Sequence, residues 1–199
     1  YQTEHHEFMV STDVVDVLPK LVKHYNEPFA DSSAIPTFYI SKVTREHVTV
    51  ALSGDGGDEN FAGYENYRQV LKWCNRNRTL PRGVCGPLRS LLEPGLSRLP
   101  YHNQVSKTRR GLRMLAGDVK EKFLLQGTIV KDEEKRWLYT RDFQSKLKAQ
   151  SDRPCPPWIY DGDSDLEPLD WMMNHDQRFY LPDDLMVKTD VASMANSLE

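Results

Sequence analysis

One short stretch of the chain, Ser53 to Glu59 (SGDGGDE), combines glycines with acidic side chains at a spacing that suits chemistry on a phosphate. Glycines let the backbone adopt positive φ and approach a ligand closely, and free N–H groups at the start of a helix can hold a phosphate. The carboxylates of Asp55, Asp58 and Glu59 would repel that phosphate unless a cation lay between them, so the stretch predicts a bridging Mg²⁺. No Gly-Lys-Ser/Thr follows the glycines, which excludes a Walker A loop. The alternative interpretation is a tight surface turn with Asp58 as the cap of the following helix.

The segments on either side of this stretch predict how it is positioned. The preceding residues 48–52 (VTVAL) form a short apolar run rich in β-branched side chains, which predicts a buried strand. A helical pattern follows, with apolar side chains at three- and four-residue spacing: Phe61, Tyr64, Tyr67, Val70 and Leu71. Strand, glycine turn and helix in this order form the usual geometry of a nucleotide site at the carboxyl edge of a parallel sheet.

A second group of charged residues lies near the C-terminal end, where Asp183, Asp184, Lys188 and Asp190 fall within about two helical turns. Asp184 and Lys188 are four residues apart and can pair on one helix face. Asp183 and Asp184 lie in the first turn of a helix that we expect to start at Pro182, where the helix dipole favours negative charge. From the residues alone, the structural interpretation is a capped helix with an internal ion pair.

The rest of the chain is predicted to be mostly helical, with loops where glycine and proline gather. The polar segment Asp31-Ser32-Ser33 either caps the helix after it or faces a ligand. The other expected elements are a second short strand at Glu7–Ser11, a helix capped by Thr12 or Asp13 and interrupted by Pro19, helices at about Pro36–Glu46, 105–150 and 166–180, loops with short helices over 80–101, and a linker over 150–164.

Length and composition bound the class of protein. The 199 residues are enough for one domain or a little more, and 39% of them are hydrophobic, so the chain is able to bury a core. No apolar run reaches the length of a membrane span and no signal peptide is recognised, so we expect no membrane contact. Cys74, Cys85 and Cys155 lack CxxC spacing, which argues against a disulfide framework or a zinc site and fits a reducing cytoplasm. The chain begins at Tyr1 and stops at Glu199 inside a helical pattern, so we expect a fragment of a longer protein.

The net charge of −3 hides a basic block, because residues 70–113 hold 10 Lys/Arg against 1 Asp/Glu. Such a block can attract RNA or another polyanion, and would then act as a binding module. The alternatives are a solvated helical face, or a surface that docks acidic parts of the same chain. The block has few aromatic side chains on which bases could stack, so nucleic-acid binding is disfavoured.

Three segments together resemble the asparagine synthetase family. SGDGGDE followed by NFAGY resembles the SGDGxDE-(L/V)F-x-GY pattern of the C-terminal synthetase domain of glutamine-dependent amidotransferases. Residues 27–37 (EPFADSSAIPT) are similar to the segment that precedes this pattern in bacterial and archaeal members. Residues 180–199 (YLPDDLMVKTDVASMANSLE) are similar to the family's segment ending in SMA-x-SLE. The segments occur in family order, and the resemblance covers nearly the whole chain.

The resemblance implies an activity, cofactors and site residues. Members of the family adenylate a carboxylate with ATP and Mg²⁺, and ammonia from glutamine hydrolysed in an N-terminal domain then attacks the acyl carbon. By resemblance, Ser53 and Gly54 contact the adenylate, Gly56 and Gly57 belong to the same nucleotide-binding loop, and Asp58 holds Mg²⁺ and pyrophosphate. Asp55 matches an acidic position linked to adenylate formation and amine attack. Along the synthetase cleft, Lys188 is expected to hold a phosphate or carboxylate and act in catalysis, while Asp190 organises partners.

The resemblance also implies a fold and its limits here. We expect an α/β fold, part of a parallel sheet of the adenine-nucleotide alpha-hydrolase type, with a largely helical remainder. Residues 1–79 are the expected nucleotide-binding part and residues 80–199 the mostly helical part. The family's SGG-x-DS loop, its late lysine and its glutaminase domain are absent from these residues, and Asn60 stands where the family usually has an apolar side chain. We therefore expect the chain to be inactive by itself.

Several functional hypotheses remain at this stage. The first is an asparagine synthetase part with aspartate as its small-molecule carboxylate substrate, in a cytoplasmic protein for which a homodimer is left open. A related hypothesis is an amidotransferase for a carboxylate on a cell-surface glycan or a secondary metabolite. A third is a polyanion-binding module that uses residues 70–113, and a fourth is a scaffold without chemistry. The intact SGDGGDE stretch speaks against the scaffold.

Overall fold

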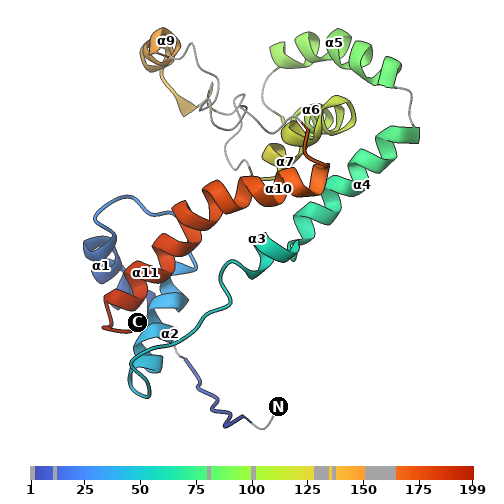
Figure 1. Cartoon of the computed structure of the whole chain (residues 1–199). Coiled ribbons are helices and arrows are strands. Elements are labelled where there is room, and N and C mark those ends of the chain that lie inside the picture. The colour runs from blue at the N-terminus through green and yellow to red at the C-terminus, as the bar shows by residue number, and fades with distance from the viewer. Residues whose placement is uncertain are drawn as a thin grey trace. The chain divides into compact units, whose positions relative to one another are not determined.

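The computed structural model describes residues 3–10, 13–79, 82–99, 102–127, 135, 138–150 and 165–199 (Figure 1). They fall into two compact units, Tyr1–Phe61 with Asp176–Glu199 (unit 1) and Ala62–His175 (unit 2), and each unit has its own core. The predicted linker over 150–164, with Cys155, lies outside the described residues apart from its first residue. The expected division of function between residues 1–79 and 80–199 stays a prediction.

Unit 1 contains three α-helices that share one core. They are α1 (Val14–Tyr25), α2 (Ala34–Arg45) and α11 (Val187–Met194), and they lie side by side in Figure 1. Their buried side chains contribute about 1.5–3 kcal/mol each where they are large and apolar. The cluster consists of Val17, Leu21, Tyr25, Ala34, Phe38 and Ala192.

The ends of α1 and α2 follow the sequence signals closely. The Asp13 carboxylate accepts hydrogen bonds from the N–H groups of Val15 and Asp16, at 3.0 and 3.3 Å, so the predicted N-cap is confirmed at Asp13. Asn26 ends α1 in the left-handed region, with φ of 54°. Pro19 lies within α1, and α2 begins at Ala34, two residues earlier than predicted.

The prediction of a parallel sheet is wrong for this structure, because the described residues contain no strand. Residues 50–54 have no regular structure. Two backbone hydrogen bonds connect this region to Glu199: Ala51 N–H donates to the Glu199 carbonyl at 2.6 Å, and Glu199 N–H donates to the Thr49 carbonyl at 2.9 Å. The apolar side chains are not buried, and Leu52 is 99% exposed. In the described part of the chain, no second segment pairs with residues 48–52 along their length, and a sheet requires such pairing. The expected strand at Glu7–Ser11 is not formed over its described residues 7–10, which are irregular, and Ser11 lies outside the described residues.

The helix predicted after the glycines is divided in two. α3 (Gly57–Phe61) ends at Phe61, the backbone turns at Ala62 with φ of 58°, and α4 (Glu65–Thr79) begins in unit 2. At the C-terminal end, the predicted helix start at Pro182 is also wrong. Pro182 lies inside a π-helix, η2 (Asp176–Met186), which continues into α11 (Figure 1).

Unit 2 is a helical assembly around an aromatic core. Its helices are α4, α5 (Arg82–Arg98), α6 (Asn103–Ala116), α7 (Val119–Gly127), α9 (Arg141–Gln150) and α10 (Pro168–His175). The rings of Phe123 and Trp171 meet edge to face, with centroids 6.0 Å apart, a favourable aromatic arrangement. The buried cluster consists of Tyr67, Val70, Phe123, Trp171 and Met172.

The region expected to be loops with short helices is instead one helix. α5 runs through Pro87 and Pro94, although proline removes a helical hydrogen bond. Side chains tie α5 to its neighbours: the Arg89 guanidinium bonds to both carboxylate oxygens of Glu121 on α7, at 2.6 and 2.8 Å, and to Glu93 at 2.7 Å. Arg113 of α6 bonds to Glu93 at 2.9 Å. Tertiary contacts of this kind outweigh a local helix-breaking signal.

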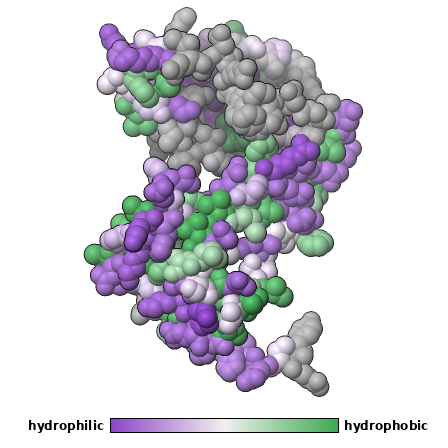
Figure 2. Space-filling model, turned by 60° about the vertical axis from the view of Figure 1, so that its left-hand side comes forward, coloured by the Kyte–Doolittle hydropathy of each residue, from purple (hydrophilic) through white to green (hydrophobic). Residues whose placement is uncertain are grey.

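Charged and apolar side chains are mixed on the surface, as the purple and green residues in Figure 2 show. On α1, for example, Val15, Leu18 and Val22 are exposed. None of the helices in the described part of the chain has both the length and the apolar content to cross a membrane.

Candidate functional site

The predicted glycine turn is present between residues 53 and 57. Gly56 has φ of +85°, a conformation that side-chain-bearing residues rarely adopt, and Gly57 N–H donates to the Gly54 carbonyl at 3.1 Å to close the turn. A Cβ atom at Gly54 or Gly57 would meet no atom within 4 Å. The prediction of a positive-φ glycine is therefore confirmed at Gly56, and the other two glycines leave open space beside the backbone.

The turn and the start of α3 line a hollow of about 500 Å³. The hollow brings together most of the residues that the sequence assigned to a nucleotide. Its lining consists of Ser53, Gly54, Asp55, Gly56, Gly57, Asn60 and Phe61.

The Asp55 carboxylate is held by two hydroxyl groups. Ser53 Oγ donates to Asp55 Oδ2 at 3.0 Å, and Thr189 Oγ1 donates to the same oxygen at 2.9 Å. Thr189 belongs to α11 and lies 134 positions further along the chain. The sequence prediction named Asp55 but missed Thr189, because nothing in the local pattern indicates a partner so far away.

Asp58 and Glu59 lie in the first turn of α3 but in different surroundings. Asp58 is exposed, whereas Glu59 is only 1% exposed. Asp58 is therefore the carboxylate of the pair that a solvent-borne cation can reach. It lies within α3, so its predicted role as the cap before the helix is not what the structure shows.

The Mg²⁺ site at Asp58 stays a prediction, and the donor set limits what kind of site it can be. In the described part of the chain, no group of three or more His, Cys, Asp or Glu side chains is arranged to hold a metal ion. Mg²⁺ at phosphate sites commonly uses one or two carboxylates and completes its shell with phosphate oxygens and water. A single exposed carboxylate at Asp58, next to an open glycine turn, fits that kind of site and not a protein-only cage.

Lys188 pairs with a different carboxylate from the one that its four-residue spacing suggested. Its ammonium group forms an ion pair with Asp31, with Nζ 2.8 Å from Oδ2, and not with Asp184. Lys188 is 9% exposed, and the Tyr25 hydroxyl donates to its backbone carbonyl at 3.0 Å. Because η2 is a π-helix, the four-residue spacing of an α-helix does not hold before residue 187.

Asp31 lies in the segment whose role was left open between capping and ligand contact. Its carboxylate accepts bonds from the Ser33 N–H at 2.8 Å and the Ser33 hydroxyl at 2.7 Å. Ser33 is the residue before α2, and its own side chain makes no capping bond. Asp31 therefore accepts hydrogen bonds from within its own segment and also forms the ion pair with Lys188.

The charges around Lys188 shift one another's pKa values. Burial would lower the pKa of Lys188, but the hydrogen bond to Asp31 and the carboxylates of Asp31 and Asp184 raise it. Burial would raise the pKa of Asp31, but the hydrogen bonds from Lys188 and Ser33 outweigh that effect and lower it. Burial and the Asp31 charge raise the pKa of Asp184. Burial and both carboxylates raise the pKa of Tyr25 to about 12. Lys188 is thus positively charged, and the cluster around it carries an excess of carboxylates.

The remaining predicted polar residues of this end are on the surface. Asp183 and Asp190 are exposed, and the Asp190 carbonyl accepts a bond from the Ser193 hydroxyl at 3.1 Å. A second hollow of unit 1, about 560 Å³, lies beside Tyr25 and Asp31 and is lined mainly by α1 and the residues before α2.

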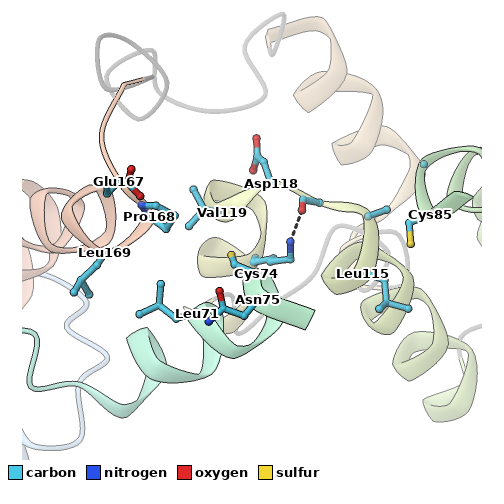
Figure 3. A pocket seen from close by; sticks show the side chains of 14 residues that line it. Leu71, Cys74, Asn75, Cys85, Leu115, Asp118, Val119, Glu167, Pro168 and Leu169 are labelled. Carbon is cyan, nitrogen blue, oxygen red and sulfur yellow. Dashed lines mark hydrogen bonds between the residues drawn. The ribbon is translucent and has the colours of Figure 1, made fainter. Parts of the chain in front are cut away.

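Unit 2 has a hollow of about 630 Å³ that contains none of the predicted site residues (Figure 3). Cys74 and Cys85 line it together with apolar side chains such as Leu71, Leu115 and Val119. Lys122 also lines this hollow; it is buried, and its ammonium group donates to the Gly117 carbonyl at 2.5 Å.

The basic block is partly neutralised within unit 2. Arg89 and Arg113 are engaged with Glu93 and Glu121, so these two arginines hold helices together. This arrangement supports the interpretation in which the block docks acidic parts of the same chain.

Comparison with known proteins identifies the class to which this chain belongs. The family model described as asparagine synthase matches residues 1–199. The chain therefore belongs to the asparagine synthase family. This confirms the prediction made from the three segments that resemble the family.

Two relatives are similar to this chain over nearly its whole length. It is 30% identical over 188 residues to asparagine synthetase [glutamine-hydrolyzing] 1 of Bacillus subtilis, which covers 94% of this chain. It is 31% identical over 201 aligned residues to a putative asparagine synthetase [glutamine-hydrolyzing] of Mycobacterium tuberculosis H37Rv, which covers 96% of this chain. The chain spans 28% of the length of each of these relatives.

A third relative is more similar over a shorter region. A putative asparagine synthetase [glutamine-hydrolyzing] 2 of Methanocaldococcus jannaschii is 45% identical over 65 residues, which is 32% of this chain and 13% of the relative. No solved structure matches the chain.

Proposed function

We propose that this chain is part of an ATP-dependent amidotransferase that adenylates aspartate and transfers glutamine-derived ammonia to it. The products would be asparagine, AMP and pyrophosphate. The observation that carries the proposal is the family match over residues 1–199, which includes an intact SGDGGDE turn. The relatives named as glutamine-hydrolyzing asparagine synthetases support the same reaction.

Adenylation places specific demands on the protein. The carboxylate must be aligned with the α-phosphate, and the charge that develops on pyrophosphate must be neutralised. The proposed nucleotide contacts are the open backbone at Gly54 and Gly57, the Gly56 turn and the Ser53 hydroxyl. Asp58, exposed beside them, would hold the Mg²⁺ that offsets the phosphate charge.

Asp55 and Lys188 receive different roles within this proposal. Asp55 faces the hollow of the glycine turn and is the proposed acidic group for adenylate formation and amine attack. Lys188 is the proposed cationic group, and it carries its charge while bound to Asp31 at 2.8 Å. A phosphate or carboxylate that reached Lys188 would share the ammonium group with Asp31, so the pair as a whole sets how strongly Lys188 attracts an anion.

The remaining parts of the proposal concern the full-length protein. A glutaminase domain of the same chain would supply ammonia, and the Bacillus subtilis relative is named as glutamine-hydrolyzing. The related proposal of another acceptor, such as a carboxylate on a glycan or a secondary metabolite, differs only in the substrate. The homodimer, the cytoplasmic location and the inactivity of the 199 residues alone stay predictions.

The test is ATP–pyrophosphate exchange with Mg²⁺ in the full natural protein that carries these residues. Wild type is compared with Asp58→Ala, and Asp16→Ala, which removes an exposed carboxylate in the first turn of α1, is the matched control. We expect exchange with aspartate in wild type and the control, and a loss of about 100-fold or more in Asp58→Ala. Exchange with another carboxylate but not aspartate would keep the mechanism and discard asparagine. A folded protein that catalyses no exchange with any carboxylate contradicts the proposal.

A further inference from the structure

The C-terminal segment of unit 1 contacts the glycine turn at Asp55 and Gly56, and it contacts α3 at Glu59 and Asn60. Gln177 Nε2 donates to the Glu59 carbonyl at 3.1 Å and to Asn60 Oδ1 at 3.3 Å. Leu181 Cδ2 lies 3.8 Å from the position that a Cβ atom of Gly56 would occupy. Thr189 Oγ1 donates to Asp55 at 2.9 Å. The turn is thus held from its first acidic residue to the middle of α3.

The π-helical winding of η2 explains how residues so far apart in this segment share one face. A π-helix has about 4.4 residues per turn and an α-helix has about 3.6. Wound throughout as an α-helix, the segment would place Thr189 about 120° away from Gln177. With η2 as far as Met186 and α11 after it, Leu181 and Thr189 both lie within about 45° of Gln177.

We propose that Thr189 is a positioning residue for Asp55, and that η2 provides the register that brings it there. The Thr189 hydroxyl and the Ser53 hydroxyl donate to the same carboxylate oxygen, so they fix the orientation of the side chain. Asp55 lies on a turn that is exposed to solvent, where a carboxylate would otherwise rotate freely. A fixed carboxylate acts at a reaction centre without first having to be ordered.

The two donors to Asp55 differ in what they can control. Ser53 is part of the turn itself and moves with it, whereas Thr189 belongs to a helix that packs on α2. Only Thr189 can therefore relate the orientation of Asp55 to the rest of unit 1. Lys188, the preceding residue of α11, holds Asp31 in the same way, so two consecutive residues of one helix fix two separate segments.

This inference rests on the proposed function, and ATP–pyrophosphate exchange in the full natural protein tests both. Thr189→Val removes the hydroxyl and keeps the shape of the side chain. We expect kcat for exchange to fall about tenfold while KM for ATP stays within about twofold, because Thr189 orients a reacting group and does not bind the nucleotide. Thr189→Ser, which restores the hydroxyl, should stay within about threefold of wild type.

Two further variants make the result specific. Thr189→Ala also lacks the hydroxyl and adds no bulk, and it is expected to lose as much kcat as Thr189→Val. Thr108→Val is the matched control, because the Thr108 hydroxyl donates only to the Gln104 carbonyl on an exposed face of α6 in unit 2. It should exchange like wild type. Thermal unfolding shows which variants are folded.

The outcomes separate the two proposals. An active wild type with unchanged kcat in a folded Thr189→Val or Thr189→Ala overturns the positioning role and leaves the proposed function intact. A Thr189→Ser as impaired as Thr189→Val also overturns it, because the hydroxyl would then not be the cause. A wild type that shows no exchange with any carboxylate overturns the proposed function and the positioning role with it.

Discussion

Each of the two units contains a network of partly buried charges, and the two networks are balanced differently. In unit 2, Arg89 and Arg113 face Glu93 and Glu121, so cations and carboxylates are equal in number. In unit 1, Lys188 is paired with Asp31 while Asp184 adds a second carboxylate to the same surroundings. The unit 2 network is neutral, and the unit 1 cluster carries an excess negative charge.

The pKa values record this difference. In unit 2, the hydrogen bonds to Glu121 and Glu93 raise the pKa of Arg89, and the two arginines lower the pKa of Glu93 against the effect of burial. In unit 1, the pKa of Asp184 is raised, because burial and Asp31 outweigh Lys188. The charges of the unit 2 network are matched, whereas the charge of Asp184 in unit 1 is only partly offset by Lys188, so protonation of Asp184 is favoured relative to a free aspartate.

The contacts in the two units also differ in sequence separation. Lys188 and Asp31 are 157 positions apart, and Thr189 and Asp55 are 134 apart, so the unit 1 contacts close very long loops. Arg89 and Glu121 are 32 positions apart and connect neighbouring helices. The unit 1 contacts therefore join segments that are far apart in the sequence, while the Arg89–Glu121 pair of unit 2 joins helices that are closer in the sequence.

The largest expected effect is in unit 1, at Lys188→Met. The side chains of Lys188 and Asp31 are 11% and 22% exposed, so the change leaves a largely buried carboxylate without its cation. Breaking a buried pair in this way costs about 3 kcal/mol of unfolding free energy, measured by urea denaturation. The double variant Lys188→Met/Asp31→Asn removes both charges and should recover most of the loss. If the single variant is as stable as wild type, the pair contributes no net stability and the contrast between the units fails.

A smaller effect is expected from Arg89→Met in unit 2. It releases Glu93 and Glu121, but these carboxylates are 25% and 31% exposed and Glu93 keeps Arg113. We expect a loss of about 2 kcal/mol in urea denaturation. The matched control is Lys146→Met, which breaks a pair whose side chains are 69% and 75% exposed and should change the free energy by no more than about 0.5 kcal/mol. ATP–pyrophosphate exchange should be unchanged in Arg89→Met, and a selective loss of exchange in a folded variant would contradict a purely structural role of Arg89.

Local features of both units could be predicted from the sequence. The cap at Asp13 depends on a carboxylate and two nearby N–H groups, and the turn at Gly56 depends on a conformation that glycine favours. Both are decided within a few residues, so the pattern alone was enough. Most residues that the sequence assigned to nucleotide binding line the hollow at the glycine turn for the same reason, because they are close together in the sequence.

Features that depend on distant partners could not be predicted. The pairing of Lys188 was expected from a four-residue spacing that applies to α-helices, but η2 is a π-helix and the partner is Asp31. The run over residues 48–52 has the composition of a strand, yet sheet formation depends on a second segment that its own sequence does not encode. α5 continues through Pro87 and Pro94 because side chains on other helices stabilise it. In each case a tertiary contact decided the outcome.

The smallest expected effect is a pH dependence that belongs to unit 1. The raised pKa of Asp184 means that its ionised form destabilises the folded state, and that this cost disappears as the pH falls through the raised pKa, above the ordinary 3.8. Asp31 has the opposite sign: its lowered pKa means that its stabilising contribution is present above pH 3.8 and is lost as the pH falls through its folded-state pKa.

Because the ionised form of Asp184 destabilises the folded state, Asp184→Asn should be more stable than wild type near neutral pH, and the difference in unfolding free energy should shrink as the solution is made mildly acid. Asp183→Asn, one residue earlier and exposed, is the control and should change the unfolding free energy by no more than about 0.5 kcal/mol. An Asp184→Asn variant that is less stable than wild type near neutral pH would show that Asp184 is compensated, and unit 1 would then be balanced like unit 2.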